Sequence, residues 1–576
     1  MPDDSPRAEY GRRQASRRAV GERLERRHRI LGNFRLLTAI AAAILIFLAI
    51  TRGAPPAFWL IFPACVFVAL LVVHAQVNRE RARCARSVAF YERALDRLDN
   101  RWAGRGETGE RFKHPLHPYA EDLDLFGPGS LFELLSTART RAGEEMLANW
   151  LRAPSPPDVL RARHQAVSEC AGSLAEWGER PPVFDQPPAR LAIALLSTLA
   201  VASFIAWGAL PWKGWREVAL ALVLINAFFY LRFRQRADHI AESAGEAAHD
   251  LALLSQVLAR LEREIFSAPR LVELKTALVA AGRPPSFRIR KLQRLMAIVE
   301  SREHIIMHAI DPVLLWTLQS ALAVESWRKQ SGPAIRAWLA AVGEMEALSS
   351  LASYAYEHPA DPFPEFAEAG PLFEGTGLAH PLLAEDRAVR NDVAISGELR
   401  LIVVSGSNMS GKSTLLRTVG INAVLAQCGA PVRAASLRIS PLTIGASIRI
   451  LDSLQDGTSH FYAEITRLKQ IVDLTQGARP VLFLFDEFLQ GTNSHDRRQG
   501  AEAMVRGLID RGAIGFLTTH DLALSEIAHG LASKAANMHF EDRLENGKLL
   551  FDYHLRPGVV QRSNALELMR SLGLDV

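Results

Sequence analysis

The sequence predicts an α/β domain with a parallel sheet over residues 370–576, behind a largely helical region that contains two pairs of apolar helices. From about Gly370 onward, short β-like apolar runs alternate with helical segments, which is the element order of a parallel α/β sheet. Upstream, four long uncharged runs lie within the first 235 positions, and apolar residues recur at helical spacing between Ala237 and Tyr356. A chain of 576 residues has room for three to four domains.

The excess positive charge of the chain lies at its N-terminus. Residues 1–35 hold ten arginines and five acidic residues, an excess equal to the net charge of +5 of the whole chain. Such an arm can contact DNA or anionic lipid, but beside an apolar helix it is more typical of a flank that sets membrane orientation. The four cysteines lie far apart without a C-x-x-C pair, which argues against a disulfide framework or zinc ribbon and favours a reducing cytosol.

The four apolar runs predict two transmembrane hairpins, at residues 36–77 and 191–231. Each run approaches the length that crosses a hydrocarbon core of roughly 30 Å, and turn-like segments separate the two runs of each pair. Buried helices of a soluble core are the alternative, but these usually have a polar face, whereas the four runs are apolar almost all round. A cleaved signal peptide fits the first run poorly, because its basic flank is long and a second apolar run follows at once.

Arginines cluster on the outer side of each predicted hairpin, at residues 26–35, 79–86 and 232–236. By the positive-inside rule, both termini are expected in the cytoplasm, which makes the chain a multi-pass protein of the cytoplasmic (inner) membrane. The expected domains are a basic arm (1–35), the first hairpin (36–77), a helical segment (78–190), the second hairpin (191–231), a second helical segment (232–362) and the α/β domain (370–576).

The segment from Gly406 to Thr414 carries the phosphate-binding pattern G-x-x-x-x-G-K-S. It follows a buried-strand pattern at residues 401–404 and opens a helix, which is the context that this pattern requires. Backbone N–H groups of such a loop surround phosphate, Lys412 contacts the β- and γ-phosphates, and Ser413 ligates Mg²⁺. The predicted ligands are therefore ATP and Mg²⁺, and the predicted nucleotide-binding residues are Gly406, Ser407, Asn408, Met409, Ser410, Gly411, Lys412, Ser413 and Thr414.

Two further strand patterns place candidate catalytic side chains at the same edge of the predicted sheet. The apolar run 481–485 ends in Asp486 and Glu487, the Walker B pattern, in which the aspartate holds Mg²⁺ and the glutamate polarises the attacking water. The run 513–519 ends at His520, which is placed to sense the γ-phosphate. Lys412, Glu487 and His520 are thus the candidate catalytic residues, and Ser413 and Asp486 the candidate metal ligands.

In this order, these pieces resemble the ATPase domain of the MutS DNA mismatch repair family, which has an ABC-type fold. The family loop G-P-N-M-G-G-K-S-T differs from residues 406–414 only at Ser407 and Ser410. His380-Pro381 and residues 429–434 also match, residues 457–464 are similar to the family's signature segment, and residues 491–494 look like its D-loop. The resemblance implies a homodimer that sandwiches ATP, with Ser459 of one subunit approaching the γ-phosphate held by the other.

A weaker resemblance, over residues 120–180 and 240–356, implies the helical core and lever of that family. MutS proteins carry long mismatch-recognition and connector domains before this core, whereas only about 120 residues precede it here and contain the first predicted hairpin. The second hairpin and the short helical region leave little room for a DNA clamp, and no basic stripe with interleaved aromatics replaces it. DNA binding is therefore left open by the sequence.

The predicted function is a membrane-anchored MutS-like ATPase that hydrolyses ATP as a dimer, with mismatched or branched DNA as a candidate ligand. The alternative is an ABC-type ATPase that acts on a membrane or protein partner without DNA. Against a transporter, the apolar helices hold no buried charges that would form a pathway, and the motif L-S-G-G-Q is missing. A scaffold that binds nucleotide without hydrolysing it is a third reading, which the potential base Glu487 argues against.

Overall fold

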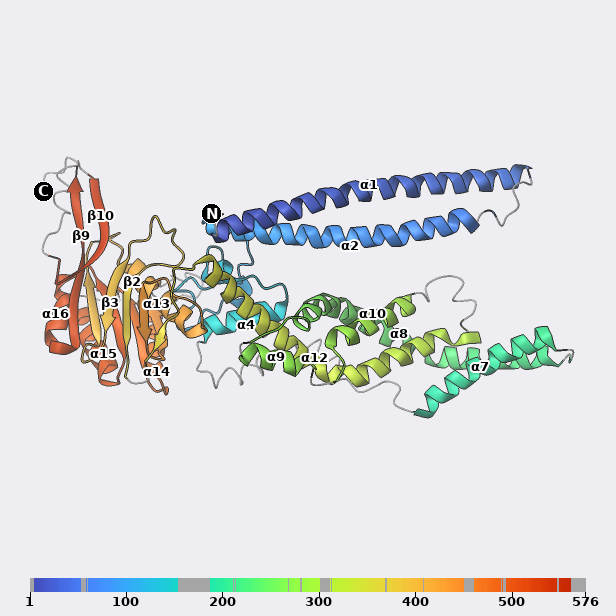
Figure 1. The fold of residues 1–576 in the computed structure, drawn as a ribbon. Helices are drawn as coiled ribbons and strands as arrows, with labels where there is room; N and C mark the ends of the chain where they lie inside the picture. Colours follow the sequence, from blue (N-terminus) through green and yellow to red (C-terminus); the bar gives the residue numbers. More distant parts are fainter. Residues whose placement is uncertain are drawn as a thin grey trace. The chain divides into compact units, whose positions relative to one another are not determined.

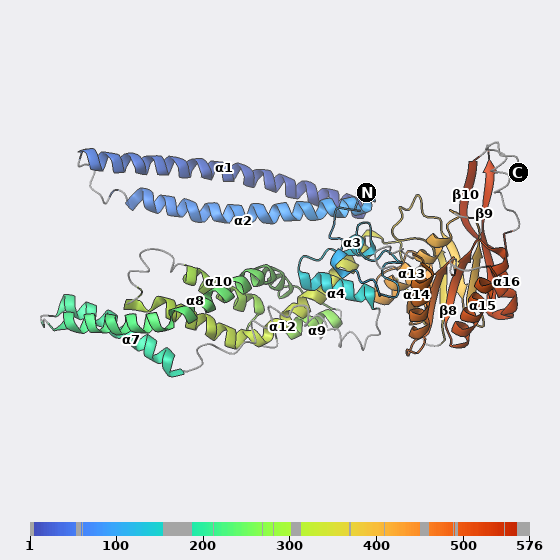
Figure 2. The same cartoon turned by 180° about the vertical axis from the view of Figure 1, so that it is seen from behind.

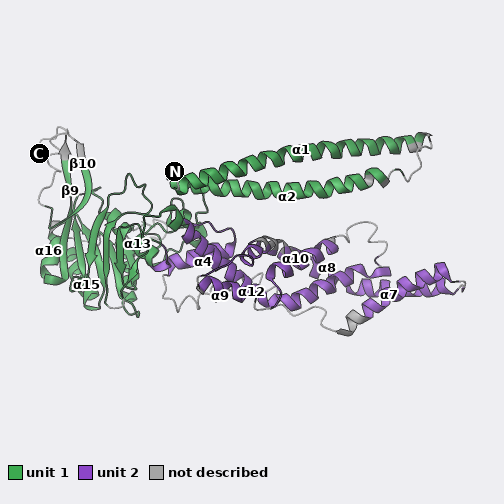
Figure 3. Ribbon diagram, in the orientation of Figure 1, with its two compact units in different colours: residues 1–135, 354–426, 431–576 green, residues 136–353, 427–430 purple. Residues whose placement is uncertain are grey.

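The computed structural model of the chain describes residues 5–52, 59, 61–153, 187–210, 212, 214–267, 269–279, 282–300, 311, 313–367, 370–407, 409–449, 460–487, 489, 494–545 and 548–560. These residues form two compact units (Figure 3). Unit 1 comprises residues 1–135, 354–426 and 431–576, and unit 2 comprises residues 136–353 and 427–430. Each unit is considered by itself.

The predicted α/β domain is confirmed in unit 1. Its main sheet has six strands in the order β10-β9-β4-β8-β7-β6, in which all neighbours are parallel except β9 and β10. A smaller sheet has the order β1-β5-β2-β3. The strands are β1 (Glu365–Phe366), β2 (Phe373–Leu378), β3 (Asn391–Ile395), β4 (Leu401–Ser405), β5 (Ser436–Ile439), β6 (Thr443–Ser447), β7 (Val481–Asp486), β8 (Ile514–Thr519), β9 (Ala535–Glu545) and β10 (Lys548–Pro557).

Helices cover the main sheet, as parallel strands require (Figures 1 and 2). They are α13 (Lys412–Cys428), α14 (His460–Leu474), α15 (Ser494–Asp510) and α16 (Leu522–Gly530), with a 3₁₀ turn at Ala532–Lys534. Strands β4 and β8 are buried along their whole length, and β7 is buried up to its last residue. This explains why their sequences are continuous apolar runs and do not alternate.

The first pair of apolar runs belongs to two long antiparallel helices of unit 1, α1 (Pro6–Arg52) and α2 (Ile61–Leu98) (Figure 1). The register is set by contacts between the helices, from Arg18 with Glu92 to His28 with Asn78. Residues 6–35, expected as a basic arm, are the first part of α1. Arginine is a good helix former, so the charged segment begins the helix that the apolar run continues.

A buried ion pair fixes the base of this helical pair within unit 1. The guanidinium of Arg97 donates to both carboxylate oxygens of Glu357, at 2.7 and 2.5 Å, and the hydroxyl of Tyr10 donates to the same carboxylate at 3.4 Å. Burial and the neighbouring Glu357 carboxylate raise the pKa of Tyr10, which keeps its hydroxyl protonated as a donor. We call Tyr10, Arg97 and Glu357 the base clamp.

Between α2 and the α/β domain, unit 1 has a short 3₁₀ turn (Glu110–Phe112) and α3 (Leu131–Leu135). Ser130 caps α3, with its hydroxyl accepting the N–H of Glu133 at 3.3 Å.

Unit 2 is helical. Its helices are α4 (Arg141–Arg152), α7 (Pro187–Ala209), α8 (Trp215–Leu261), α9 (Pro269–Val279), α10 (Pro285–Glu300) and most of α12 (Trp316–Glu357). One apolar core runs through it, with Leu251, Leu292 and Trp338 among its fully buried members. The second pair of apolar runs lies in α7 and the start of α8.

Two of the described helices are long and apolar enough to cross a membrane, over Pro6–Leu48 and Ala192–Ala209. The predicted turn of the first hairpin at residues 53–58 lies outside the described residues, as do residues 154–186 of the first helical segment. Among the described residues only one helix of each predicted hairpin meets this criterion, since α2 and α8 do not, and the four membrane spans stay a prediction.

Candidate functional site

Matched strand register assembles the candidate site. In the main sheet Ser405, the last residue of β4, lies beside Thr519 of β8, and Thr518 lies beside Asp486 of β7. The carboxyl ends of the three strands therefore meet at one edge, where ligands bind in open α/β sheets. The segments that follow them are the phosphate-binding loop, His520 and Glu487.

The loop after β4 wraps the side chain of Lys412. Its ammonium group is almost fully buried and donates to the carbonyl oxygens of Gly406 at 3.0 Å and Ser407 at 2.8 Å. A Cβ at Gly406 would lie 2.7 Å from Ser410 Oγ and 3.3 Å from the carbonyl oxygen of Phe540, so this close approach favours glycine. Gly411 has a positive φ of 100°, which also favours glycine.

Glu487 lies between the other two predicted catalytic residues, Lys412 and His520. One carboxylate oxygen is 3.3 Å from Lys412 Nζ, and the other is 3.3 Å from His520 Nδ1. The backbone of Glu487 has a φ of 45°, a conformation that non-glycine residues rarely adopt and that concentrates at functional sites. Its N–H is held by Thr518, whose carbonyl oxygen accepts at 3.2 Å. The three candidate catalytic side chains are thus brought together.

The donor set fits Mg²⁺ bound together with a phosphorylated ligand. Ser413 and Asp486 line the same cavity, and the hydroxyl of Thr518 donates to one oxygen of the Asp486 carboxylate. Mg²⁺ prefers oxygen ligands and commonly takes one or two from the protein, with phosphate oxygens and waters completing the shell. The buried hydroxyls of Ser407 and Ser410 have no hydrogen-bond partner among the described residues, as is expected of a loop built to bind an anion.

A cavity of about 750 Å³ opens over the phosphate-binding loop. Its walls hold the predicted Met409, Gly411, Lys412, Ser413, Thr414, Asp486 and Glu487. Apolar residues from other elements complete it, among them Leu378, Val389, Phe540 and Tyr553. The combination of a polar floor and apolar walls suits a ligand with a phosphate chain and a flat base.

Some predicted site residues lie outside the described residues. These are Asn408 of the loop, Ser459 of the signature-like segment, and residues 491–493 of the D-loop-like segment. His380, matched only by family resemblance, lines the cavity.

Residues 117–124 form a strap, not predicted from the sequence, that ties three parts of the α/β domain together. The fully buried carboxylate of Asp122 accepts the N–H groups of Ile448 and Arg449 at 2.8 Å each and binds Arg467 of α14 at 3.0 Å. Asp124 binds Arg449 and also Arg417 of α13, both at 2.7 Å. The strap therefore joins the helix that follows the phosphate-binding loop to the segment that leads into residues 450–459.

His380 gives the site a testable pH dependence. Burial, aided by the positive charge of Arg417, lowers the pKa of His380 to about 4. Its folded-state pKa thus lies below the ordinary value near 6.5, so the stability that the neutral imidazole contributes is complete above pH 6.5 and is lost as the pH falls toward 4. We predict that between pH 6.5 and pH 4 the wild type loses about 3 kcal/mol more unfolding free energy than the His380→Asn variant does.

Asparagine retains an acceptor for the N–H of Leu382, which Nδ1 of His380 accepts at 3.3 Å. The measurement is urea unfolding of both proteins at several pH values, followed by circular dichroism. Equal losses of stability in the wild type and the variant would contradict the assignment.

Comparison with known proteins agrees with this geometry. Residues 402–575 match the protein family described as MutS domain V. Endonuclease MutS2 of Thermus thermophilus is 32% identical over 219 residues, which cover 37% of this chain and 27% of that protein. DNA mismatch repair protein MutS of Geobacillus thermodenitrificans is 27% identical over 289 residues, covering 49% and 31% respectively.

A further relative, DNA mismatch repair protein MutS of Thermus thermophilus, is 30% identical over 290 residues, which cover 50% of this chain and 33% of that protein. The matched region thus spans about a third or less of the length of these relatives. Residues 402–575 are therefore similar to MutS domain V, and over this region the chain resembles the MutS and MutS2 proteins.

Proposed function

We propose that this chain is a membrane-anchored ATPase that binds and hydrolyses MgATP between the α/β domains of two copies. The observation that carries the proposal is the position of the Glu487 carboxylate, which lies between Lys412 and His520 at the edge of the sheet. Hydrolysis of ATP needs a positioned water, neutralised phosphate charge and a metal clamp, and the residues at this edge have the chemistry for each.

The proposed roles follow from the side chains themselves. Lys412 neutralises charge on the β- and γ-phosphates, and Glu487 orients the attacking water and accepts its proton. His520, held beside Glu487, donates to the transferred phosphoryl group. Mg²⁺ held by Ser413 and Asp486 would supply further charge neutralisation.

The dimer is proposed from the family resemblance and the MutS domain V match. In this arrangement Ser459 reaches the γ-phosphate bound by the partner subunit. The strap supports such a role for the neighbouring segment, because Asp122 fixes the two residues, 448 and 449, that precede residues 450–459.

Exposed apolar side chains support membrane anchoring. No residue of the apolar window in α1 is buried, and 22% of the window in α7 is buried. Large apolar side chains on these helices are mostly exposed: Leu37 of α1 by 61%, Phe47 of α1 by 65% and Ile205 of α7 by 65%. Helices that belong to a water-soluble core bury such residues, so these surfaces fit a lipid environment better.

DNA is proposed as the ligand whose binding responds to nucleotide. Two of the relatives named above are DNA mismatch repair proteins and one is an endonuclease. The competing proposal is an ATPase that acts on a membrane or protein partner without DNA.

Substitutions at the site separate binding from hydrolysis. We predict that Lys412→Ala abolishes ATP binding, because the phosphates lose their buried cation, and that Glu487→Gln retains binding but lowers kcat by at least ~100-fold, as loss of a general base does. The Glu487→Gln chain should also accumulate as an ATP-bound dimer. Ser459→Ala should slow hydrolysis and leave ATP binding intact. Nucleotide binding and phosphate release report these effects, and normal turnover in all three variants would refute the site.

The strap predicts a split between kcat and KM. In Asp122→Asn the charge that faces Arg467 is lost, so residues 448–449 are held less firmly while the phosphate-binding loop stays intact. We expect kcat to fall about tenfold, the equivalent of 1.4 kcal/mol, with KM for ATP changed less than about twofold. Asp473→Asn is the matched control, because its exposed pair with Lys469 lies at the far end of the same helix, α14. Equal effects of the two substitutions would contradict a positioning role.

The role of DNA is tested with the detergent-solubilised full chain. We predict binding to mismatched or branched DNA that is stronger than binding to homoduplex and that changes when ATP is added, measured across a salt series. Glu487→Gln is tested alongside the wild type. A chain that keeps ATP bound should show a single DNA affinity, that of the ATP-bound state. Salt-labile binding without structural preference, or no binding, would favour the protein or membrane partner.

A further inference from the structure

Six arginines on the α1–α2 pair form what we call the arginine collar: Arg26, Arg27 and Arg29 on α1, and Arg79, Arg83 and Arg86 on α2. All six are exposed. None has a side-chain hydrogen bond or ion pair with another described residue. The collar is therefore a concentrated positive surface whose charge is not used to hold the two helices together.

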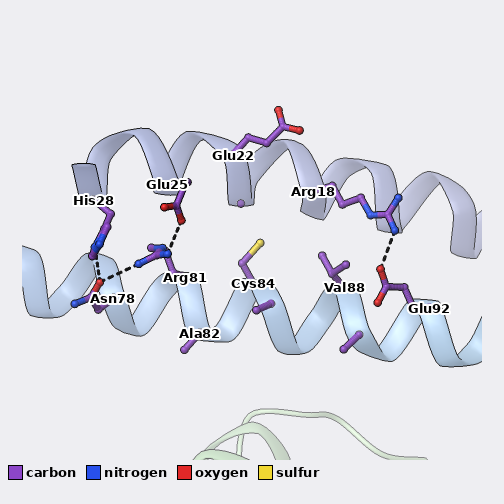
Figure 4. Close-up of a pocket in the computed structure, with 13 residues that line it drawn as sticks. Arg18, Glu22, Glu25, His28, Asn78, Arg81, Ala82, Cys84, Val88 and Glu92 are labelled. Atoms are coloured by element: carbon purple, nitrogen blue, oxygen red, sulfur yellow. Dashed lines mark hydrogen bonds and ion pairs between the residues drawn. The ribbon is translucent and has the colours of Figure 1, made fainter. Parts of the chain in front are cut away.

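Other arginines of the pair do hold it together. Arg18 of α1 pairs with Glu92 of α2 at 2.7 Å, and Arg81 of α2 pairs with Glu25 of α1 (Figure 4). Arg97 belongs to the base clamp. The six arginines of the collar are thus available to bind an external anion, whereas Arg18, Arg81 and Arg97 stabilise the fold.

Both helices become mainly apolar near the same height, with Arg35 of α1 lying beyond it over the ring of Phe67 of α2. His28 contacts Asn78, with Nδ1 2.8 Å from Oδ1 (Figure 4). The ring of His28 also lies 4.6 Å from that of His74, so residue 28 of α1 is level with residues 74–78 of α2. Just beyond this level, Ile30 and Phe34 are exposed on α1, and Val72 and Val73 are exposed on α2. The collar stands at this level and just before it. The boundary is thus a plane shared by two helices, which the sequence of one helix cannot reveal.

We propose that the arginine collar binds the headgroups of anionic phospholipids where the α1–α2 pair enters the membrane. This rests on the membrane anchoring of the proposed function and adds the lipid class. Guanidinium groups match phosphate oxygens in geometry and charge, and basic residues beside an apolar segment attract anionic leaflets. Duplex DNA carries phosphates too, but it gains nothing from an adjoining surface of exposed isoleucine, phenylalanine and valine, whereas a lipid satisfies both surfaces at once.

The test uses the full chain reconstituted in phosphatidylcholine vesicles that contain a trace of spin-labelled lipid. Electron spin resonance measures how strongly spin-labelled phosphatidylglycerol, relative to spin-labelled phosphatidylcholine, associates with the protein surface. We expect a preference of at least about threefold for phosphatidylglycerol that weakens in 1 M salt, where the screening length is about 3 Å. Replacing Arg26, Arg27 and Arg29 together by glutamine should reduce the preference by about half, and replacing all six should abolish it.

The matched control replaces three exposed basic residues of α10, Arg290, Lys291 and Arg294, by glutamine. They also have no side-chain partner among the described residues, and removing them should leave the lipid preference unchanged. An unchanged preference in the six-arginine variant, or an equal loss in the control, overturns the proposal. So does loss of duplex DNA binding by that variant without any change in its lipid preference.

Failure of membrane anchoring is recognised separately. If alkaline carbonate releases the wild-type chain from the vesicles, the anchoring itself is wrong and the collar proposal falls with it. If the chain resists extraction yet shows equal association with both lipids, the anchoring stands and the collar proposal alone is overturned.

Discussion

The parallel pairing of β4, β8 and β7 in matched register is the constraint on which the candidate site depends. Each strand contributes one short segment, and none of these segments is a site by itself. Because Ser405 lies beside Thr519 and Asp486 beside Thr518, a shift of one residue in either pairing would turn the following side chains to the other face of the sheet. The close packing of Phe483 on Gly515, where an added Cβ would lie 2.4 Å from the ring, opposes such a shift between β7 and β8. Residues of the core thus help to hold Lys412, Glu487 and His520 in their 3.3 Å contacts.

Local patterns explain how much of this could be predicted. A phosphate-binding loop is a contiguous strand, loop and helix, so residues 406–414 and the ends of β7 and β8 were readable from the sequence. The strap was not, because Asp122 and Asp124 are separated from Arg417 and Arg449 by about 300 positions and their spacing matches no motif. Tyr553 was missed for a similar reason. It reaches the cavity from β10, the edge strand that pairs antiparallel with β9, and no motif marks it in the sequence.

The structure of the helical region could also be predicted only in part from the sequence. Apolar runs marked the places where helices interact with something other than water, but they did not mark where the helices begin and end. The first run, at residues 36–50, is the distal part of a helix of 47 residues, and the remainder carries the arginines. Which arginines pair across the helices and which stay exposed depends on the rotation of α1 against α2, and that rotation is set by contacts such as His28 with Asn78 and Cys84 Sγ with the carbonyl oxygen of Arg17.

Because the base clamp fixes one end of the α1–α2 pair, the length of α1 sets the distance between the clamp and the arginine collar. Tyr10 is held at the clamp and Arg29 stands in the collar, and the helix between them rises about 28 Å at 1.5 Å per residue. Within unit 1 this sets a fixed standoff between the collar and the clamp beside the α/β domain. Inserting a single residue in α1 would add only about 1.5 Å of length but would rotate everything beyond it by about 100°. The orientation of the collar is therefore far more sensitive to helix length than its distance is.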